Sequence, residues 1–158
     1  MARTLPAAAY WLIGAVGTSR VVTRLHPVAY RWFGSAAPVG RSFGIRSVVL
    51  TTIGSRSGTA REVALYAIEN SERFVAIGSN GGRERAPAWV SNLRALPEGT
   101  VPVGRNRVIP VSAREAEGDE RERLWAAAVA SFPGYARYQA RVNRRIAVIV
   151  LERTATVP

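Results

Sequence analysis

Short β-branched segments separated by turn residues make up most of the chain beyond residue 45. Turn residues separate the first three of these segments, and Gly104-Arg105-Asn106 separates the fourth from the fifth, so neighbours in sequence are expected to pair as antiparallel hairpins. This order lacks the regular strand-helix alternation of a doubly wound sheet. It predicts a mainly β, α+β protein: a small six-stranded antiparallel barrel with helices packed outside. The expected strands are residues 46–53, 61–68, 73–78, 100–103, 107–114 and 146–151.

Three segments between the strands have the spacing of helices. Residues 86–96 repeat apolar side chains at helical intervals, and residues 118–132 begin with acidic residues, which are favourable at the positive end of a helix dipole. Pro133 should end the second helix, and a short helix is expected over residues 135–142.

The chain divides into a basic arm with a linker, residues 1–45, and a barrel domain, residues 46–158. Residues 10–33 suit two short helices, and the glycine- and proline-containing segment 34–40 suits a linker. The 158-residue chain has a net charge of +11, and its first 61 residues contain eight arginines but no acidic residue. Such a field attracts nucleic acid, an anionic membrane surface or a phosphorylated cofactor.

The most apolar stretch, residues 5–17, is shorter than the ~18–20 residues of a membrane-spanning helix. Three interpretations stay open: the hydrophobic part of a signal peptide, a helix lying on a membrane surface, or a helix packed on the domain. We expect a cytoplasmic protein with peripheral contact to the inner face of the membrane through this arm.

The chain has no cysteine and a single histidine, His26. Thiolate sites and cysteine nucleophiles are therefore excluded, as is any site that needs several histidines. No metal site is predicted, and a histidine-based catalytic triad is disfavoured.

The loop from Gly54 to Arg61 combines two glycines, two serines and two arginines. Backbone N–H groups, hydroxyls and guanidinium groups there are able to converge on an anion, although a solvated hairpin tip explains the same composition. It is neither a Walker loop nor a dinucleotide fingerprint, because no Gly-Lys-Ser/Thr and no helix follow it.

Two further clusters are candidates for ligand contacts. Residues 78–82, a glycine-rich strand end, precede the helix of residues 86–96 and allow close approach of a flat or anionic ligand. Tyr135 and Tyr138 share a helix face, either as packing against the barrel or as an aromatic lid over a reacting group. Trp89 is alternatively a core residue instead of a stacking platform for a ligand, and Asn92 is alternatively a local helix cap instead of a ligand contact.

Taken together, these segments resemble the deazaflavin-dependent nitroreductase and quinone reductase family, whose members use coenzyme F420. The resemblance covers residues 48–153 through TTIGSRSGTAR, LYAI, GSNGG with PAWVSNL, ERERLW, FPGYARYQARVNRRI and VIVLER, in the family order. It implies a split β-barrel related to the flavin-binding barrels, with the deazaflavin in a groove. It also implies hydride transfer from reduced F420 to a quinone, a nitroaromatic or another electron-poor acceptor.

The resemblance further implies roles for individual residues. Ser55, Arg56, Ser57 and Arg61 would surround the cofactor phosphate and acidic tail. The other cofactor contacts would be Glu62, Val63, Ala64, Leu65, Tyr66, Ile77, Gly78, Ser79, Asn80, Ala88, Trp89, Val90, Ser91 and Asn92. Tyr135, Tyr138 and Phe132 would form the substrate side. Tyr135, then Ser79, are the candidates for supplying a proton or orienting the acceptor, with solvent as the competing source.

Two positions depart from the family pattern. Asn80 stands where a basic residue is common, which weakens one phosphate contact. Phe132 stands where tyrosine is usual, which removes a phenol and argues against a nitroreductase-like range of substrates. Two other functions stay as alternatives: a non-enzymatic basic module on nucleic acid or membrane, and a related barrel that binds FMN, haem or a lipid. We expect no nucleic-acid partner, because most aromatic residues fall at core spacing. The oligomeric state is not predicted.

Overall fold

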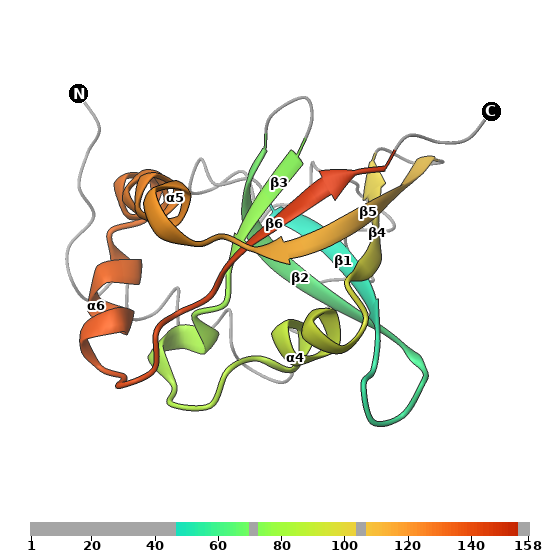
Figure 1. Ribbon diagram of the computed structural model, residues 1–158, viewed down its shortest axis with the longest axis horizontal. Helices are drawn as coiled ribbons and strands as arrows, with labels where there is room; N and C mark the ends of the chain where they lie inside the picture. The colour runs from blue at the N-terminus through green and yellow to red at the C-terminus, as the bar shows by residue number, and fades with distance from the viewer. Residues whose placement is uncertain (1–46, 70–72, 104–106, 155–158) are drawn as a thin grey trace.

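Six antiparallel strands close into a barrel in the order β1-β2-β3-β6-β5-β4 in the computed structural model, which describes residues 47–69, 73–103 and 107–154 (Figure 1). This confirms the predicted barrel of antiparallel strands. The strands are β1 (Ser47–Ile53), β2 (Ala60–Glu69), β3 (Arg73–Ile77), β4 (Glu98–Val103), β5 (Arg107–Glu115) and β6 (Val148–Arg153).

Hairpins between sequence neighbours supply three of the six strand pairings, β1–β2, β2–β3 and β4–β5, as the turn residues predicted. β1 pairs with β2 from Ser47 opposite Tyr66 to Ile53 opposite Ala60, and β4 pairs with β5 along its whole length. The barrel closes where β1 pairs with β4, through one residue pair, Thr51 opposite Thr100. Gly99 permits this approach, because a Cβ there would lie 2.8 Å from the Thr51 carbonyl oxygen.

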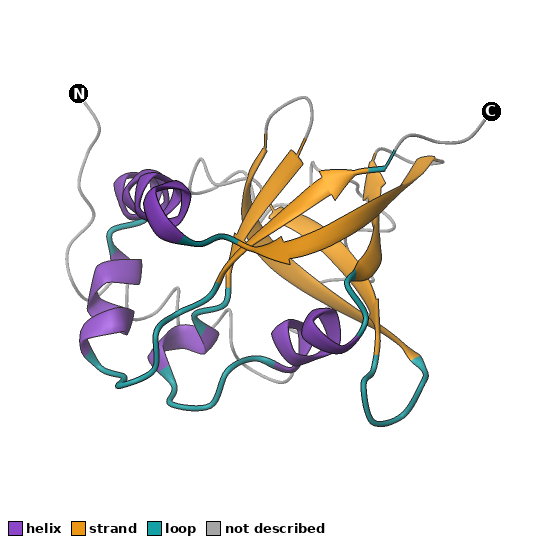
Figure 2. Ribbon diagram, in the orientation of Figure 1, coloured by secondary structure: helices purple, strands orange, loops and turns teal. Residues whose placement is uncertain are grey.

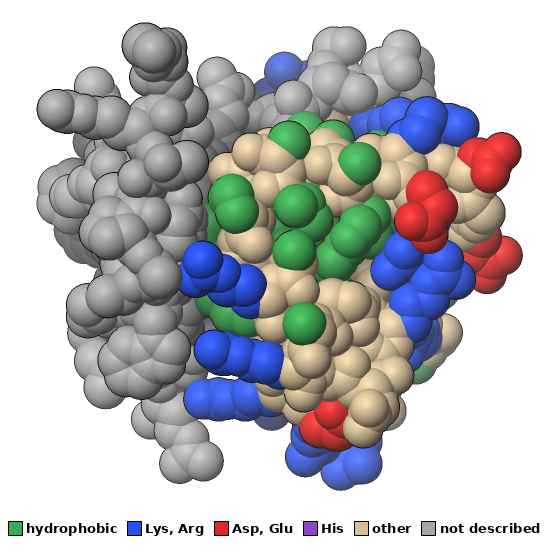
Figure 3. All heavy atoms as spheres, turned by 90° about the vertical axis from the view of Figure 1, so that its left-hand side faces the viewer, with side chains coloured by type: hydrophobic (Ala, Val, Ile, Leu, Met, Phe, Trp, Pro, Cys, Tyr) green, Lys and Arg blue, Asp and Glu red, His purple; other side chains and the backbone are tan. Residues whose placement is uncertain are grey.

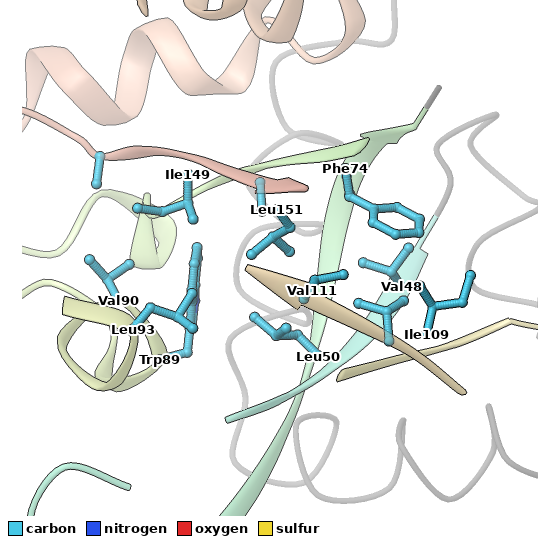
Figure 4. Close-up of a cluster of buried hydrophobic side chains, with 14 residues drawn as sticks. Val48, Leu50, Phe74, Trp89, Val90, Leu93, Ile109, Val111, Ile149 and Leu151 are labelled. Atoms are coloured by element: carbon cyan, nitrogen blue, oxygen red, sulfur yellow. The ribbon is translucent and has the colours of Figure 1, made fainter. Parts of the chain in front are cut away.

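Alternating side chains of the strands fill the barrel interior. Val48 and Leu50 of β1 point inward with Phe74 of β3 and Leu151 of β6, and Trp89 of α4 (Ala88–Ala95) approaches from one end (Figure 4). Burial of these side chains is the main stabilising contribution, and it holds α4 at that end of the barrel.

Two helices cover the outer face of β3 and β6 (Figure 2). They are α5 (Gly118–Ser131) and α6 (Gly134–Ala140), and a 3-10 turn, η2 (Asn80–Gly82), follows β3. Val148 and Val150 pack against this helical layer while Ile149 and Leu151 face the interior. Because β6 is buried on both faces, its sequence is continuously apolar rather than alternating.

Element boundaries differ from the predictions by a few residues. β6 begins at Val148 rather than residue 146, although Ile146 and Ala147 are buried, and α6 ends at Ala140 rather than residue 142. The turn expected between the second and third strands, at residues 69–72, lies outside the described residues except for Glu69, which ends β2. The turn at 104–106, the N-terminal arm and the linker also lie outside them. No helix within the described part of the chain is long and apolar enough to cross a membrane.

Candidate functional site

One cavity of about 740 Å³ brings together the three clusters singled out in the sequence. Its walls come from the β1–β2 loop, β2, the end of β3, the region from η2 to α4, and α6. The predicted residues that line it are Ser55, Arg56, Ser57, Arg61, Glu62, Val63, Ala64, Leu65, Tyr66, Ile77, Ser79, Asn80, Ala88, Trp89, Ser91, Asn92, Phe132, Tyr135 and Tyr138.

Two predicted contact residues lie elsewhere. Val90 is fully buried in the barrel core, and Gly78 packs beneath the cavity beside Val90 and Ala147. A Cβ on Gly78 would lie 2.9 Å from the Val90 side chain, so this glycine serves close packing. Helical periodicity explains Val90, because it shares a face of α4 with Leu93, three residues on, and both belong to the core cluster.

Most of the backbone N–H groups that the sequence suggested for the β1–β2 loop are bound within the protein. The N–H groups of Ser57 and Gly58 donate to the Gly54 carbonyl at 3.1 and 2.8 Å, and the N–H of Gly54 donates to the Thr59 carbonyl at 2.9 Å. The N–H of Ser55 donates to Asn92 Oδ1 at 3.0 Å. Anion contact in this loop therefore falls to side chains, chiefly the exposed guanidinium groups of Arg56 and Arg61.

Asn92 holds this loop against helix α4. Its Oδ1 accepts the hydrogen bond from the Ser55 N–H, and its Nδ2 donates to Thr52 Oγ1 at 3.1 Å. The residue is only 6% exposed. The residue lines the cavity as predicted, but both ends of its amide bind protein. Its position makes it the joint between two walls of the site.

Arg85 is a cavity-lining cation that the sequence interpretation missed. Asn80, at a positive φ of 49°, donates from Nδ2 to the Arg85 carbonyl at 2.8 Å and so fixes the segment that carries this arginine. The Asn-Gly-Gly sequence is typical of positive φ values, but it does not indicate a hydrogen bond from the Asn80 side chain to a carbonyl five residues further along the chain.

Strand β2 presents two kinds of side chain to the site region. Val63 and Leu65 lie on one face of the pleat and pack against the barrel core, whereas Glu62, Ala64 and Tyr66 lie on the other face. All five line the cavity. Burial raises the pKa of Tyr66, which keeps its phenol protonated at neutral pH.

An aromatic cluster of Phe132, Tyr135 and Tyr138 also lines the cavity. The ring of Tyr135 lies 5.1 Å from that of Phe132, edge to face, and 6.4 Å from that of Tyr138. Trp125 of α5, which the sequence did not single out, supports Tyr135 from behind at 6.4 Å. Burial, with smaller contributions from Tyr66 and Tyr138, raises the pKa of Tyr135 well above its usual range. Its hydroxyl therefore stays protonated and able to donate a hydrogen bond.

The surface near this cluster combines apolar and cationic side chains. On the side of the molecule where α5 and α6 lie, exposed apolar side chains are bordered by the positively charged side chains of arginines (Figure 3).

Comparison with known proteins identifies related sequences and structures. The model of the F420H(2)-dependent quinone reductase family matches residues 22–153. An F420H(2)-dependent quinone reductase of Mycobacterium tuberculosis (strain ATCC 25618 / H37Rv) is 30% identical over 148 residues, which cover 90% of this chain and 96% of the relative.

Solved structures share the barrel. A structure of an F420-H2 dependent reductase is 39% identical with a TM-score of 0.61, and the match covers 67% of this chain and 93% of that one. The haem storage protein HutZ of Vibrio cholerae is 12% identical with a TM-score of 0.51, over 70% of this chain and 82% of that one, a likeness of fold alone.

Proposed function

Because the chain belongs to the F420H(2)-dependent quinone reductase family, it is an oxidoreductase with coenzyme F420 as its cofactor, and we propose that the cavity described above binds F420 beside a quinone. Other electron-poor acceptors, nitroaromatics among them, are proposed as further substrates of the same site.

The observation that carries the proposal is the polarity of the cavity. Arg56, Arg61 and Arg85 line it together with the aromatic side chains of α6. A cofactor with a phosphate, an acidic tail and a flat ring needs cations and an apolar wall within one space. The residues present therefore fit the group that the family requires.

When bound, reduced F420 supplies a hydride from its deazaflavin ring. The protein's contribution is then to bind, orient and exclude water. The arginines hold the anionic part, Ala88 and Ser91 of α4 line one side, and the buried ring of Trp89 limits access of water from the barrel end.

Reduction of a quinone needs a proton as well as a hydride. We assign Tyr135 to donate a hydrogen bond to the acceptor oxygen, because its phenol lines the cavity and its raised pKa keeps it protonated. Ser79, 9% exposed and also at the cavity, is the second candidate. With the Tyr135 pKa so high, solvent is the final source of the transferred proton.

The decisive experiment is titration of the purified protein with F420, followed by oxidation of reduced F420 in the presence of menadione. We expect saturable binding and acceptor-dependent oxidation. Arg56→Ala with Arg61→Ala, and separately Arg85→Ala, should each weaken F420 binding about tenfold or more, the scale of a lost charge-assisted contact.

Arg83→Ala is the matched control, because Arg83 is exposed near Arg85 but does not line the cavity. Absence of any change in F420 fluorescence with the unaltered protein would contradict the proposed function. Purification with bound FMN would instead support the alternative cofactor, and a shift of random duplex DNA would support the basic-module alternative.

Peripheral membrane contact through residues 1–17 is proposed from the sequence alone, because quinones reside in lipid and this apolar stretch is flanked by arginines. Deletion of residues 1–17 should abolish flotation with anionic liposomes. Undiminished flotation would exclude that segment as the anchor.

A further inference from the structure

The segment that follows β3 takes an unusual backbone course beside the cavity. Asn80, Gly81 and Gly82 have positive φ values of 49°, 63° and 73° in succession. Within the segment, the N–H of Gly82 donates to the Ser79 carbonyl at 3.0 Å and the N–H of Arg83 donates to the Asn80 carbonyl at 3.3 Å. These two bonds leave the carbonyls of Gly78 and Arg83 to partners outside the segment.

One guanidinium group supplies much of this support. Arg144 donates from Nη1 to the Gly78 carbonyl at 3.1 Å and from Nη2 to the Ser79 carbonyl at 2.9 Å. Its Nε donates to the Arg83 carbonyl at 3.2 Å. The planar fork of an arginine suits such a set of acceptors, whereas a lysine ammonium lacks the geometry.

The partners of Arg144 are backbone carbonyls rather than acids. No carboxylate among the described residues lies within ion-pair distance of it. Burial lowers the pKa of Arg144, while Glu84 nearby opposes this shift. The adjacent Asn143 N–H donates to the Glu84 carboxylate at 3.2 Å, so residues 143 and 144 hold both ends of the segment.

Arg144 is itself anchored to helix α6. Gln139 Nε2 donates to the Arg144 carbonyl at 2.9 Å, and the N–H of Ile146 donates to Gln139 Oε1 at 2.9 Å. Gly82 packs directly on Tyr138, since a Cβ on Gly82 would lie 3.1 Å from Tyr138 Cα. The segment and the tyrosine-bearing helix therefore form one connected wall.

We propose that Arg144 is a positioning residue: its three hydrogen bonds hold residues 78–83 in the shape that presents Ser79 and Asn80 to the cavity, and thereby set the affinity for F420. The effect on F420 affinity rests on the proposed function, which names F420 as the ligand. The three hydrogen bonds of Arg144 do not, because they hold the segment in the protein without cofactor.

Arg144→Gln is the test variant, and the neighbouring Arg145→Gln is its control. Arg145 is 63% exposed and pairs with Glu122 on the surface. In cofactor-free protein, hydrogen–deuterium exchange measured by mass spectrometry should accelerate at least tenfold across residues 78–85 in Arg144→Gln only. The F420 Kd should rise at least tenfold in that variant, with the menadione KM within twofold.

Arg144→Lys separates geometry from charge and also decides the question if Arg144→Gln fails to fold. We expect a folded protein with faster exchange across residues 78–85 and at least fivefold weaker F420 binding. Unaltered exchange and F420 affinity in Arg144→Lys, or equal effects of Arg144→Gln and Arg145→Gln, would overturn the inference. Failure of the unaltered protein to bind F420 would count against the proposed function instead, because the exchange measurement does not use the cofactor.

Discussion

Asn92 joins helix α4 to the β1–β2 loop through both ends of its amide group. The hydrogen bonds to Ser55 and Thr52 span 37 and 40 residues of sequence and lie within a largely buried environment. An amide is suited to this position because it donates and accepts at once. The cationic loop is thus oriented by a side chain rather than by its own backbone alone.

Substitution of Asn92 by alanine should lower the free energy of unfolding by about 1–3 kcal/mol, because it leaves the buried Thr52 hydroxyl and the Ser55 N–H short of a partner. It should also weaken F420 binding, since the loop with Arg56 loses its anchor. Urea unfolding and F420 titration measure the two effects. Asn143→Ala, at an exposed position, is the control, and equal stability of the two variants would contradict this role.

Tyr135 is expected to act as a neutral hydrogen-bond donor. Because burial raises its pKa, the phenol stays protonated up to and beyond pH 10, so kcat should show no loss from its ionisation below that pH. Tyr135→Phe should lower kcat for menadione by roughly 10- to 100-fold, the lower end of general-acid effects. Steady-state kinetics from pH 6 to 10 would reveal either outcome, and an unchanged kcat would transfer the role to Ser79 or solvent.

At the scale of elements, the site depends on how α6 meets the segment after β3. Gly82 is in contact with Tyr138, whereas Gly118, at the start of α5, has a similarly positive φ but open space around its Cα. Substitution of Gly118 by alanine therefore measures the cost of the backbone conformation alone, and substitution of Gly82 measures that cost together with the cost of packing against Tyr138.

Gly118→Ala should cost about 1 kcal/mol, the strain of a left-handed non-glycine residue. Gly82→Ala should cost roughly 2–4 kcal/mol, because overpacking against Tyr138 adds about 1–3 kcal/mol to that strain. Urea unfolding of both variants measures the difference. Losses of equal size would mean that α6 moves aside freely and that the connected wall is not rigid.

The strand expectations were accurate because each strand carries its own local pattern, while errors arose where an element ends. Val148 rather than Ile146 begins β6, because the Ile146 N–H donates to Gln139 Oε1 at 2.9 Å and its carbonyl accepts from Arg121 Nη2 at 3.2 Å instead of pairing with a strand. Such an exchange between distant segments leaves no local periodic signal.

At the scale of the molecule, an ionic network ties the helical layer to the barrel. Glu120 of α5 binds Arg114 of β5 at 2.6 and 2.9 Å and Arg73 of β3 at 3.2 Å, and Arg114 also contacts Glu152 of β6 at 3.0 Å. Four elements therefore meet at one surface cluster, on the outer side of the barrel.

Hydrogen bonds from Arg114, with a smaller contribution from Arg73, lower the pKa of Glu120. A lowered folded-state pKa stabilises the protein above the ordinary glutamate pKa, and this contribution is lost as pH falls through the folded value. Stability should thus decline below about pH 4.5, the ordinary value. Glu120→Gln should lose up to about 1 kcal/mol at pH 7 and show a weaker acid dependence, because exposed ion pairs are screened by solvent.

Urea unfolding from pH 3.5 to 7 checks this pH dependence. Glu98→Gln is the control, because Glu98 makes no ion pair with any described residue. Parallel pH profiles for the unaltered protein and Glu120→Gln would show that the network contributes nothing measurable.

The sequence by itself determined the strands, their hairpin order, the helices outside the barrel and the three clusters that line the cavity, because β-branching, turn residues and side-chain periodicity are local properties. It did not determine which groups in those clusters are free to bind. Only the tertiary structure showed that loop N–H groups are used internally, that Val90 belongs to the core and that Arg85 reaches the cavity. The reason is distance along the chain: Arg144 meets Gly78 across 66 residues, a contact that exists only once the barrel has closed.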